Sequence, residues 1–85
     1  MAEVHELPVP DEAGDAGEAH ELVRGWLIDN RLVCGLSPSA FEDPAAWGVL
    51  LADVAHHIAN ALAESEGADR AAVLGAIRRA FEVET

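Results

Sequence analysis

Cysteine, lysine and tyrosine are scarce or missing in this sequence. Its 85 residues include one cysteine, Cys34, and neither lysine nor tyrosine. A single cysteine excludes an internal disulfide and a zinc site built from several thiolates. Because Cys34 lies in the middle of an apolar segment, we expect it to be a small packing residue rather than a nucleophile.

Long hydrophobic runs are also missing. A helix that crosses a bilayer needs about 20 predominantly apolar residues, and no segment of the sequence reaches that length. The first residues contain neither a basic cluster nor a hydrophobic stretch, so we expect no signal peptide. The sequence therefore predicts a soluble, cytoplasmic protein.

Positive charge is sparse. Five arginines stand against 16 acidic residues, which gives a formal net charge of −11. Nucleic acids and anionic membranes are bound by clustered Lys and Arg, so we expect neither as a partner. The acidity is typical of a solubilising surface. A basic protein that this chain neutralises, in the manner of an antitoxin, is the alternative.

Residues 1–19 differ in composition from the rest of the chain. They contain prolines, glycines and acids but no arginine. Segments of this composition cannot bury enough apolar surface to fold. We therefore predict a flexible acidic tail over residues 1–19 and a single small domain over residues 20–85.

Residues 22–37 predict a β-hairpin. Asp29 and Asn30 both tolerate left-handed backbone and suit a two-residue turn, and strand-forming residues flank them on both sides. One face of this hairpin would be apolar throughout, with Val23, Gly25, Leu27, Leu32, Cys34 and Leu36. The alternative is a helix over Glu18–Ile28, because its apolar residues also recur at helical spacing.

Two helices are predicted after the hairpin. Asp43 can cap the first and Pro44 fits its first position, while Gly67 suits its left-handed end. Asp69 can cap the second helix. The first helix has a broad apolar stripe: Trp47, Leu50, Leu51, Val54, Ala55, Ile58, Ala61 and Leu62. The predicted fold class is α+β: a β-hairpin followed by two amphipathic helices packed on one face of the sheet.

The helical segment resembles a known family. The block FEDPAAWGVLLADVAHHIANALA, followed by DRAAVLGAIRRAF, is similar to short uncharacterised bacterial proteins defined as a domain of unknown function. The resemblance covers about residues 20 to 82, and its most specific parts are DPAAWG, LAD and HIANA. It implies a compact bacterial domain and supplies no catalytic residue.

Asp53 and His57 are the strongest candidates for metal chemistry. Residues at i and i+4 of a helix can grip one metal ion through a carboxylate and an imidazole. A zinc site needs a third protein ligand, which here would come from a distant histidine or another chain. The alternative is an ordinary contact between two surface side chains. We expect no bound metal, no cofactor and no catalytic residue.

Six residues are candidates for an interface between subunits: Trp26, Ile28 and Val33 on the hairpin, and Gly48, Ala52 and Ala59 on the first helix. A chain of this length buries only about 60% of its unfolded surface, so it needs help to be stable. We therefore expect a homodimer, with the hairpin favoured as its contact. The predicted function is a self-associating structural or protein-interaction module without catalytic activity. The alternatives are a small-molecule or metal-binding protein using Asp53 and His57, or the antitoxin-like partner.

Overall fold

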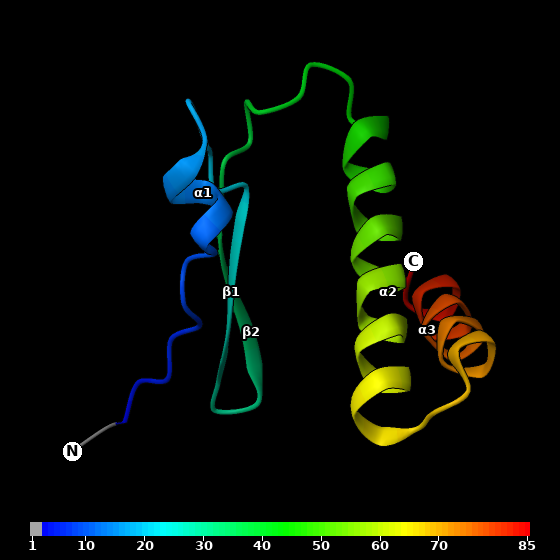
Figure 1. The fold of residues 1–85 in the computed structure, drawn as a ribbon. Coiled ribbons are helices and arrows are strands. Elements are labelled where there is room, and N and C mark those ends of the chain that lie inside the picture. Colours follow the sequence, from blue (N-terminus) through cyan, green and yellow to red (C-terminus); the bar gives the residue numbers. More distant parts are fainter. Residues whose placement is uncertain (1–2) are drawn as a thin grey trace. The chain divides into compact units, whose positions relative to one another are not determined.

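The computed structural model describes residues 3–85 and confirms the α+β class. Its elements are α1 (Asp11–Asp15), β1 (Val23–Ile28), β2 (Arg31–Leu36), α2 (Ala45–Glu66) and α3 (Arg70–Glu84), as Figure 1 shows. The chain divides into two compact units, Met1–Ala40 and Phe41–Thr85. The first contains the hairpin and the second contains the helical pair. None of the helices among the described residues combines the length and apolar character that a bilayer crossing requires.

The hairpin closes through a two-residue turn. β1 and β2 pair antiparallel, with Ile28 opposite Arg31, so Asp29 and Asn30 form the connection. Both have left-handed backbone, with φ of 49° and 63°. Two such residues make a type I′ turn, whose twist matches that of the strands. The predicted hairpin is confirmed, and the alternative helix over Glu18–Ile28 is wrong because this turn and its strand pairing fix the segment as extended.

The register divides the hairpin into the two predicted faces. One face carries the pairs Val23–Leu36, Gly25–Cys34 and Leu27–Leu32, and the other carries Arg24–Gly35, Trp26–Val33 and Ile28–Arg31. All six residues of β2 are exposed, whereas Arg24 and Trp26 of β1 are partly covered. Cys34 is exposed, so the packing role expected of it is not found among the described residues.

A short helix lies in the segment predicted to be a tail. α1 has five residues, and no side chain caps its start. Asp11 and Glu12 occupy its first turn, where negative charge complements the helix dipole. This turn was not predicted from the sequence. The flexibility of residues 1–19 stays a prediction.

α2 begins where the sequence predicts. The Asp43 carboxylate accepts a hydrogen bond from the Ala45 N–H at 3.0 Å, and Pro44 already has helical backbone. At the other end Gly67 has a φ of 66°, the left-handed conformation that glycine adopts without a steric penalty. Asp69 then caps α3 by accepting from the Ala71 N–H at 3.1 Å. All four local signals are confirmed.

α2 and α3 pack against each other. Ala59 is fully buried and is the one residue in that class among residues 3–85. Ala55 and Ala63 lie one helical turn before and after it and are partly covered, as are Val73 and Ile77 of α3. Since residues four apart share a helix face, these positions mark the seam between the two helices.

Arg70 joins the two helices by a polar contact that the sequence did not predict. Its Nη2 lies 2.9 Å from Nδ1 of His56, and its Nε donates to Oδ1 of Asn60. His56 and Asn60 are four residues apart, so both lie on the same face of α2. The first residue of α3 is thereby tied to the side of α2.

Candidate functional site

Large apolar side chains of the hairpin remain exposed. Leu27 and Leu32 face each other across the strands, with exposed fractions of 76% and 73%. Val23 and Leu36 on the same face are also exposed. No acidic residue lies on this face. A monomeric protein seldom leaves a contiguous apolar patch without a use, so this face is a candidate for association.

The three predicted interface residues of the hairpin lie together. Trp26 is paired with Val33, and Ile28 follows two residues along the same face. Ile28 and Val33 are exposed, whereas Trp26 is partly covered. Both faces of the hairpin therefore offer apolar surface.

The three predicted interface residues of the helix are separated by the fold. Gly48 and Ala52 are exposed, and a Cβ added at Gly48 would meet no atom within 4 Å. Ala59 is buried in the seam with α3, where no partner can reach it. These three residues, Gly48, Ala52 and Ala59, form a small-residue band on α2, which thus has an exposed part near the start of the helix and a buried part near its end.

The broad apolar stripe of α2 is incompletely covered within the helical unit. Leu51, Val54 and Ile58 are each nearly half exposed. Trp47 packs edge-to-face against Phe41, with ring centroids 5.1 Å apart and planes at 82°. The seam with α3 runs along Ala55, Ala59 and Ala63 at the edge of this stripe, so the larger side chains of the stripe form a second apolar surface.

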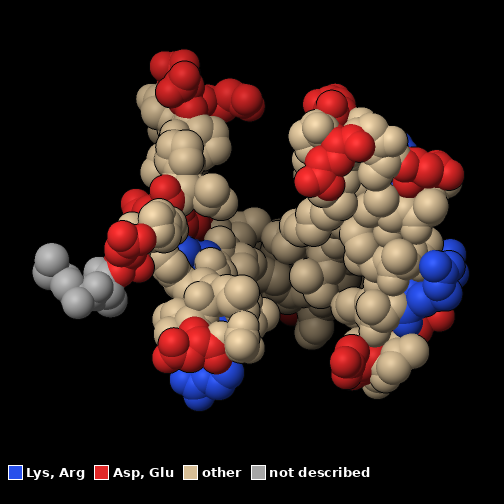
Figure 2. Space-filling model, turned by 90° about the horizontal axis from the view of Figure 1, so that it is seen from below, with Lys and Arg blue, Asp and Glu red and all other residues tan. Residues whose placement is uncertain are grey.

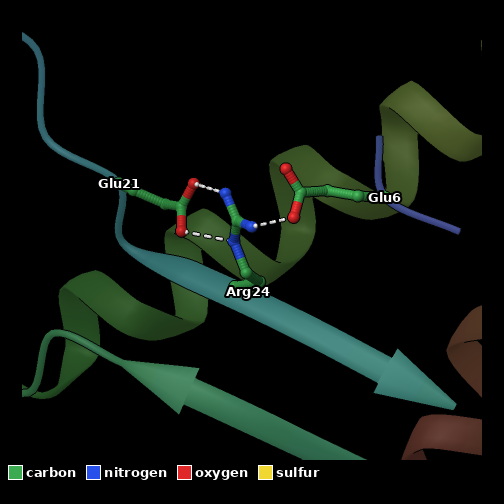
Figure 3. Close-up of polar contacts among 3 residues, drawn as sticks. All are labelled: Glu6, Glu21 and Arg24. Carbon is green, nitrogen blue, oxygen red and sulfur yellow. Dashed lines mark hydrogen bonds and ion pairs between the residues drawn. The ribbon is translucent and has the colours of Figure 1, made fainter. Parts of the chain in front are cut away.

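Arg24 is held by two carboxylates, as Figure 3 shows. Its Nε and Nη2 donate to Glu21 at 2.8 and 2.9 Å, and its Nη1 lies 3.1 Å from a carboxylate oxygen of Glu6. The hydrogen bond with Arg24 lowers the pKa of Glu21, and the same bond raises the pKa of Arg24. These groups are well solvated, so the pairs add little stability. They place the N-terminal segment beside β1.

A groove of about 620 Å³ lies between the N-terminal segment and β1. Its walls come from His5–Pro10 on one side and Val23–Trp26 on the other. Arg24 is the cation in this lining, and Glu6 and Glu21 already engage it. The groove therefore offers no free positive charge to an anionic ligand.

Asp53 and His57 are exposed neighbours on α2. No hydrogen bond or ion pair joins them. Within residues 3–85, no group of three or more His, Cys, Asp or Glu side chains is arranged to hold a metal ion. Within the helical unit, the described residues therefore bring no third ligand to the pair.

We expect zinc and chelators to leave the melting temperature unchanged, because two ligands on an exposed helix hold a metal only weakly. Differential scanning fluorimetry with one equivalent of Zn²⁺, and separately with EDTA, measures this. A rise of several degrees that disappears in His57→Ala would contradict the expectation and favour a metal-binding role.

Comparison with known proteins decides the family. The model of the family described as a domain of unknown function, DUF5076, matches residues 6–85. The chain belongs to this family. The match includes the hairpin and both long helices, and it confirms the resemblance drawn from the helical segment.

One solved structure is similar over nearly the whole DUF5076 chain. It is described as the "structure of a putative pyruvate dehydrogenase from the photosynthetic bacterium Rhodopseudomonas palustrus CGA009". It shares 32% sequence identity with a TM-score of 0.75, over 99% of this chain and 85% of that one. The comparison with curated proteins finds no match.

Proposed function

We propose that this DUF5076 protein is a self-associating structural module that acts as a homodimer joined through its hairpin. One observation carries the proposal: among the described residues, Ala59 alone is fully buried. A folded domain is stabilised mainly by removing apolar surface from water. Contact with a second copy through the hairpin would remove part of the surface that this chain leaves exposed.

The hairpin is a better contact than the exposed part of the small-residue band. A two-stranded hairpin is marginally stable alone and leaves both strand edges unpaired. Its exposed Leu27, Ile28, Leu32 and Val33 offer a large apolar area, whereas Gly48 and Ala52 offer little. Apolar and aromatic residues are typical of the core of subunit interfaces.

The negative charge of the chain opposes association, so it restricts which residues can form the contact between subunits. The chain has a formal net charge of −11, and acidic groups far outnumber basic ones on the face drawn in Figure 2. Two such chains repel each other, and salt screens that repulsion. The contact must therefore exclude acidic side chains, and added salt should strengthen it.

The side-chain arrangement supports association better than catalysis. An enzyme site groups titratable residues in a shielded pocket, whereas no polar or charged side chain among residues 3–85 is buried. The described residues therefore give no support for carrying the dehydrogenase description of the Rhodopseudomonas protein over to this chain. These surfaces therefore favour the hypothesis of a bacterial module without catalytic activity.

Light scattering at micromolar concentration tests the homodimer. We expect twice the 9.0 kDa mass of the chain, and a dimer that tightens in 0.5 M salt. Val33→Glu should give a monomer, because it adds like charges to the hairpin contact. Ala52→Glu is the matched control and should remain dimeric. A monomeric mass for the unmodified chain would overturn the proposal, and the reverse response of the two variants would move the contact to α2.

A further inference from the structure

We propose that two copies of the chain join edge to edge, with β2 of one copy antiparallel to β2 of the other and the two-fold axis at Cys34. The result is a four-stranded sheet in which the two β2 strands are central. This inference rests on the proposed homodimer and specifies its contact.

The two edges of the hairpin differ. β1 is accompanied by the N-terminal segment, since Glu6 contacts Arg24 and His5–Pro10 line a groove along Val23–Trp26. Within the hairpin unit, β2 is exposed along its whole length. It contains neither proline nor an acidic residue, and its single charged residue, Arg31, lies at its end, so little along the strand prevents edge pairing.

The backbone of β2 is arranged to bond outward at alternate residues. The Ser37 N–H donates to the Leu22 carbonyl at 3.0 Å, which makes Leu22 and Ser37 a hydrogen-bonded pair of the ladder. Such pairs alternate along an antiparallel ladder, so Arg31, Val33 and Gly35 turn their N–H and C=O groups toward β1. The N–H and C=O groups of the other three β2 residues therefore point to the free edge: Leu32, Cys34 and Leu36.

Symmetry limits the possible registers. In an antiparallel pair, directly opposite residues lie on the same face, and a two-fold axis perpendicular to the sheet maps each face onto itself. The axis must therefore lie midway between one residue and the same residue of the second copy. An axis at Cys34 pairs Cys34 with Cys34 of the second copy and Leu32 with Leu36 of the second copy. Every residue of β2 whose N–H and C=O point outward then has a partner. An axis at Val33 pairs Leu32 with Cys34 and leaves Leu36 without a partner.

Charge favours the same place. No Asp or Glu occurs between Asn30 and Phe41, in a chain with 16 acidic residues. Arg31 is the one charged residue of β2, and an axis at Cys34 sets it opposite Ser37 of the second copy. A second chain can therefore approach this edge without meeting like charges. The same register extends the apolar face of Leu27 and Leu32 across all four strands.

Cross-linking through the native cysteine tests the register. Directly opposite hydrogen-bonded residues have Cα atoms about 5.5 Å apart, within the range of about 4.4–6.8 Å that a disulfide allows. Mild oxidation with copper phenanthroline should convert most of the chain to a disulfide-linked dimer on a non-reducing gel. A Val33→Cys variant that also carries Cys34→Ser should cross-link at least tenfold more slowly, because its two cysteines would be diagonal neighbours about 7–8 Å apart, beyond the Cα separation that a disulfide allows.

A proline variant tests the edge itself. Cys34→Pro removes an outward N–H and leaves the bonds to β1 in place, a position where proline is tolerated in an edge strand. We expect it to be monomeric by light scattering with the circular dichroism of the parent, while Cys34→Ser remains dimeric. A dimeric Cys34→Pro would contradict edge pairing.

The outcomes separate this inference from the proposed function. Faster cross-linking of the Val33→Cys variant would overturn the register. Light scattering could show a dimer while neither the unmodified chain nor the Val33→Cys variant cross-links. That result would overturn edge pairing and leave the homodimer standing. A monomer would overturn both.

Discussion

Replacing Trp47 with alanine should lower the free energy of unfolding by about 3 kcal/mol, near the lower end of the range for a large aromatic residue. The indole ring lies at the start of α2 and is partly covered. It packs edge-to-face on Phe41, with centroids 5.1 Å apart, and such a pair contributes about 0.5–1.5 kcal/mol beyond its buried area. Urea unfolding followed by circular dichroism at one protein concentration measures the loss.

Trp47→Phe is the matched control. It keeps an aromatic ring against Phe41 and most of the apolar volume, so it should cost less than about 1.5 kcal/mol. If Trp47→Ala also cost less than that, the indole would not be a packing residue and the described contact would be wrong.

Gly67→Ala should cost about 1–2 kcal/mol, because the alanine Cβ disfavours left-handed backbone. Gly67 ends α2 with a φ of 66°, and its N–H donates to the Leu62 carbonyl. The chain must take this conformation to turn toward α3. Urea unfolding at the concentration used for Trp47→Ala gives the value.

Gly48→Ala is the control for the same chemical change in ordinary helix. Its new Cβ would enter open space, so it should stabilise the chain by about 0.5–1 kcal/mol. Both substitutions reduce the freedom of the unfolded chain to a similar degree. The opposite signs of the two changes in unfolding free energy must therefore come from the native backbone, which is left-handed at Gly67 and helical at Gly48. Equal effects would contradict the left-handed end of α2, and loss of the dimer in Gly48→Ala would move the contact to this part of the helix.

The local signals in the sequence were sufficient for the elements. Asp29 and Asn30 predict the turn because their short polar side chains tolerate positive φ, and the observed pair adopts it. Asp43, Gly67 and Asp69 predict helix ends for equally local reasons. Each depends on a few neighbouring residues, so the sequence alone contains the necessary information.

The sequence did not predict in the same way which helices and strands contact each other. Periodicity shows that Leu51, Val54 and Ile58 share a face, but it does not show which neighbour that face meets. The seam with α3 instead contains Ala59, where a small side chain allows two helices to approach closely. Arg70 and its partner His56 are 14 residues apart, and no spacing rule connects them. The sequence placed Asp53 and His57 one turn apart and offered no third ligand nearby in the chain, but which distant side chains approach the pair depends on the tertiary fold.

The connections in each unit are short. The hairpin closes over two residues, and α2 reaches α3 through the three residues Gly67–Asp69. Closing such short loops costs little chain entropy, and hairpins of this kind form in about 1–10 μs. Encounter between two chains is slower and depends on their concentration. If two copies pair as proposed, a freshly synthesised molecule would carry a finished but unpaired β2 for an interval that lengthens as its copies become rarer. During that interval any extended peptide could compete for the strand.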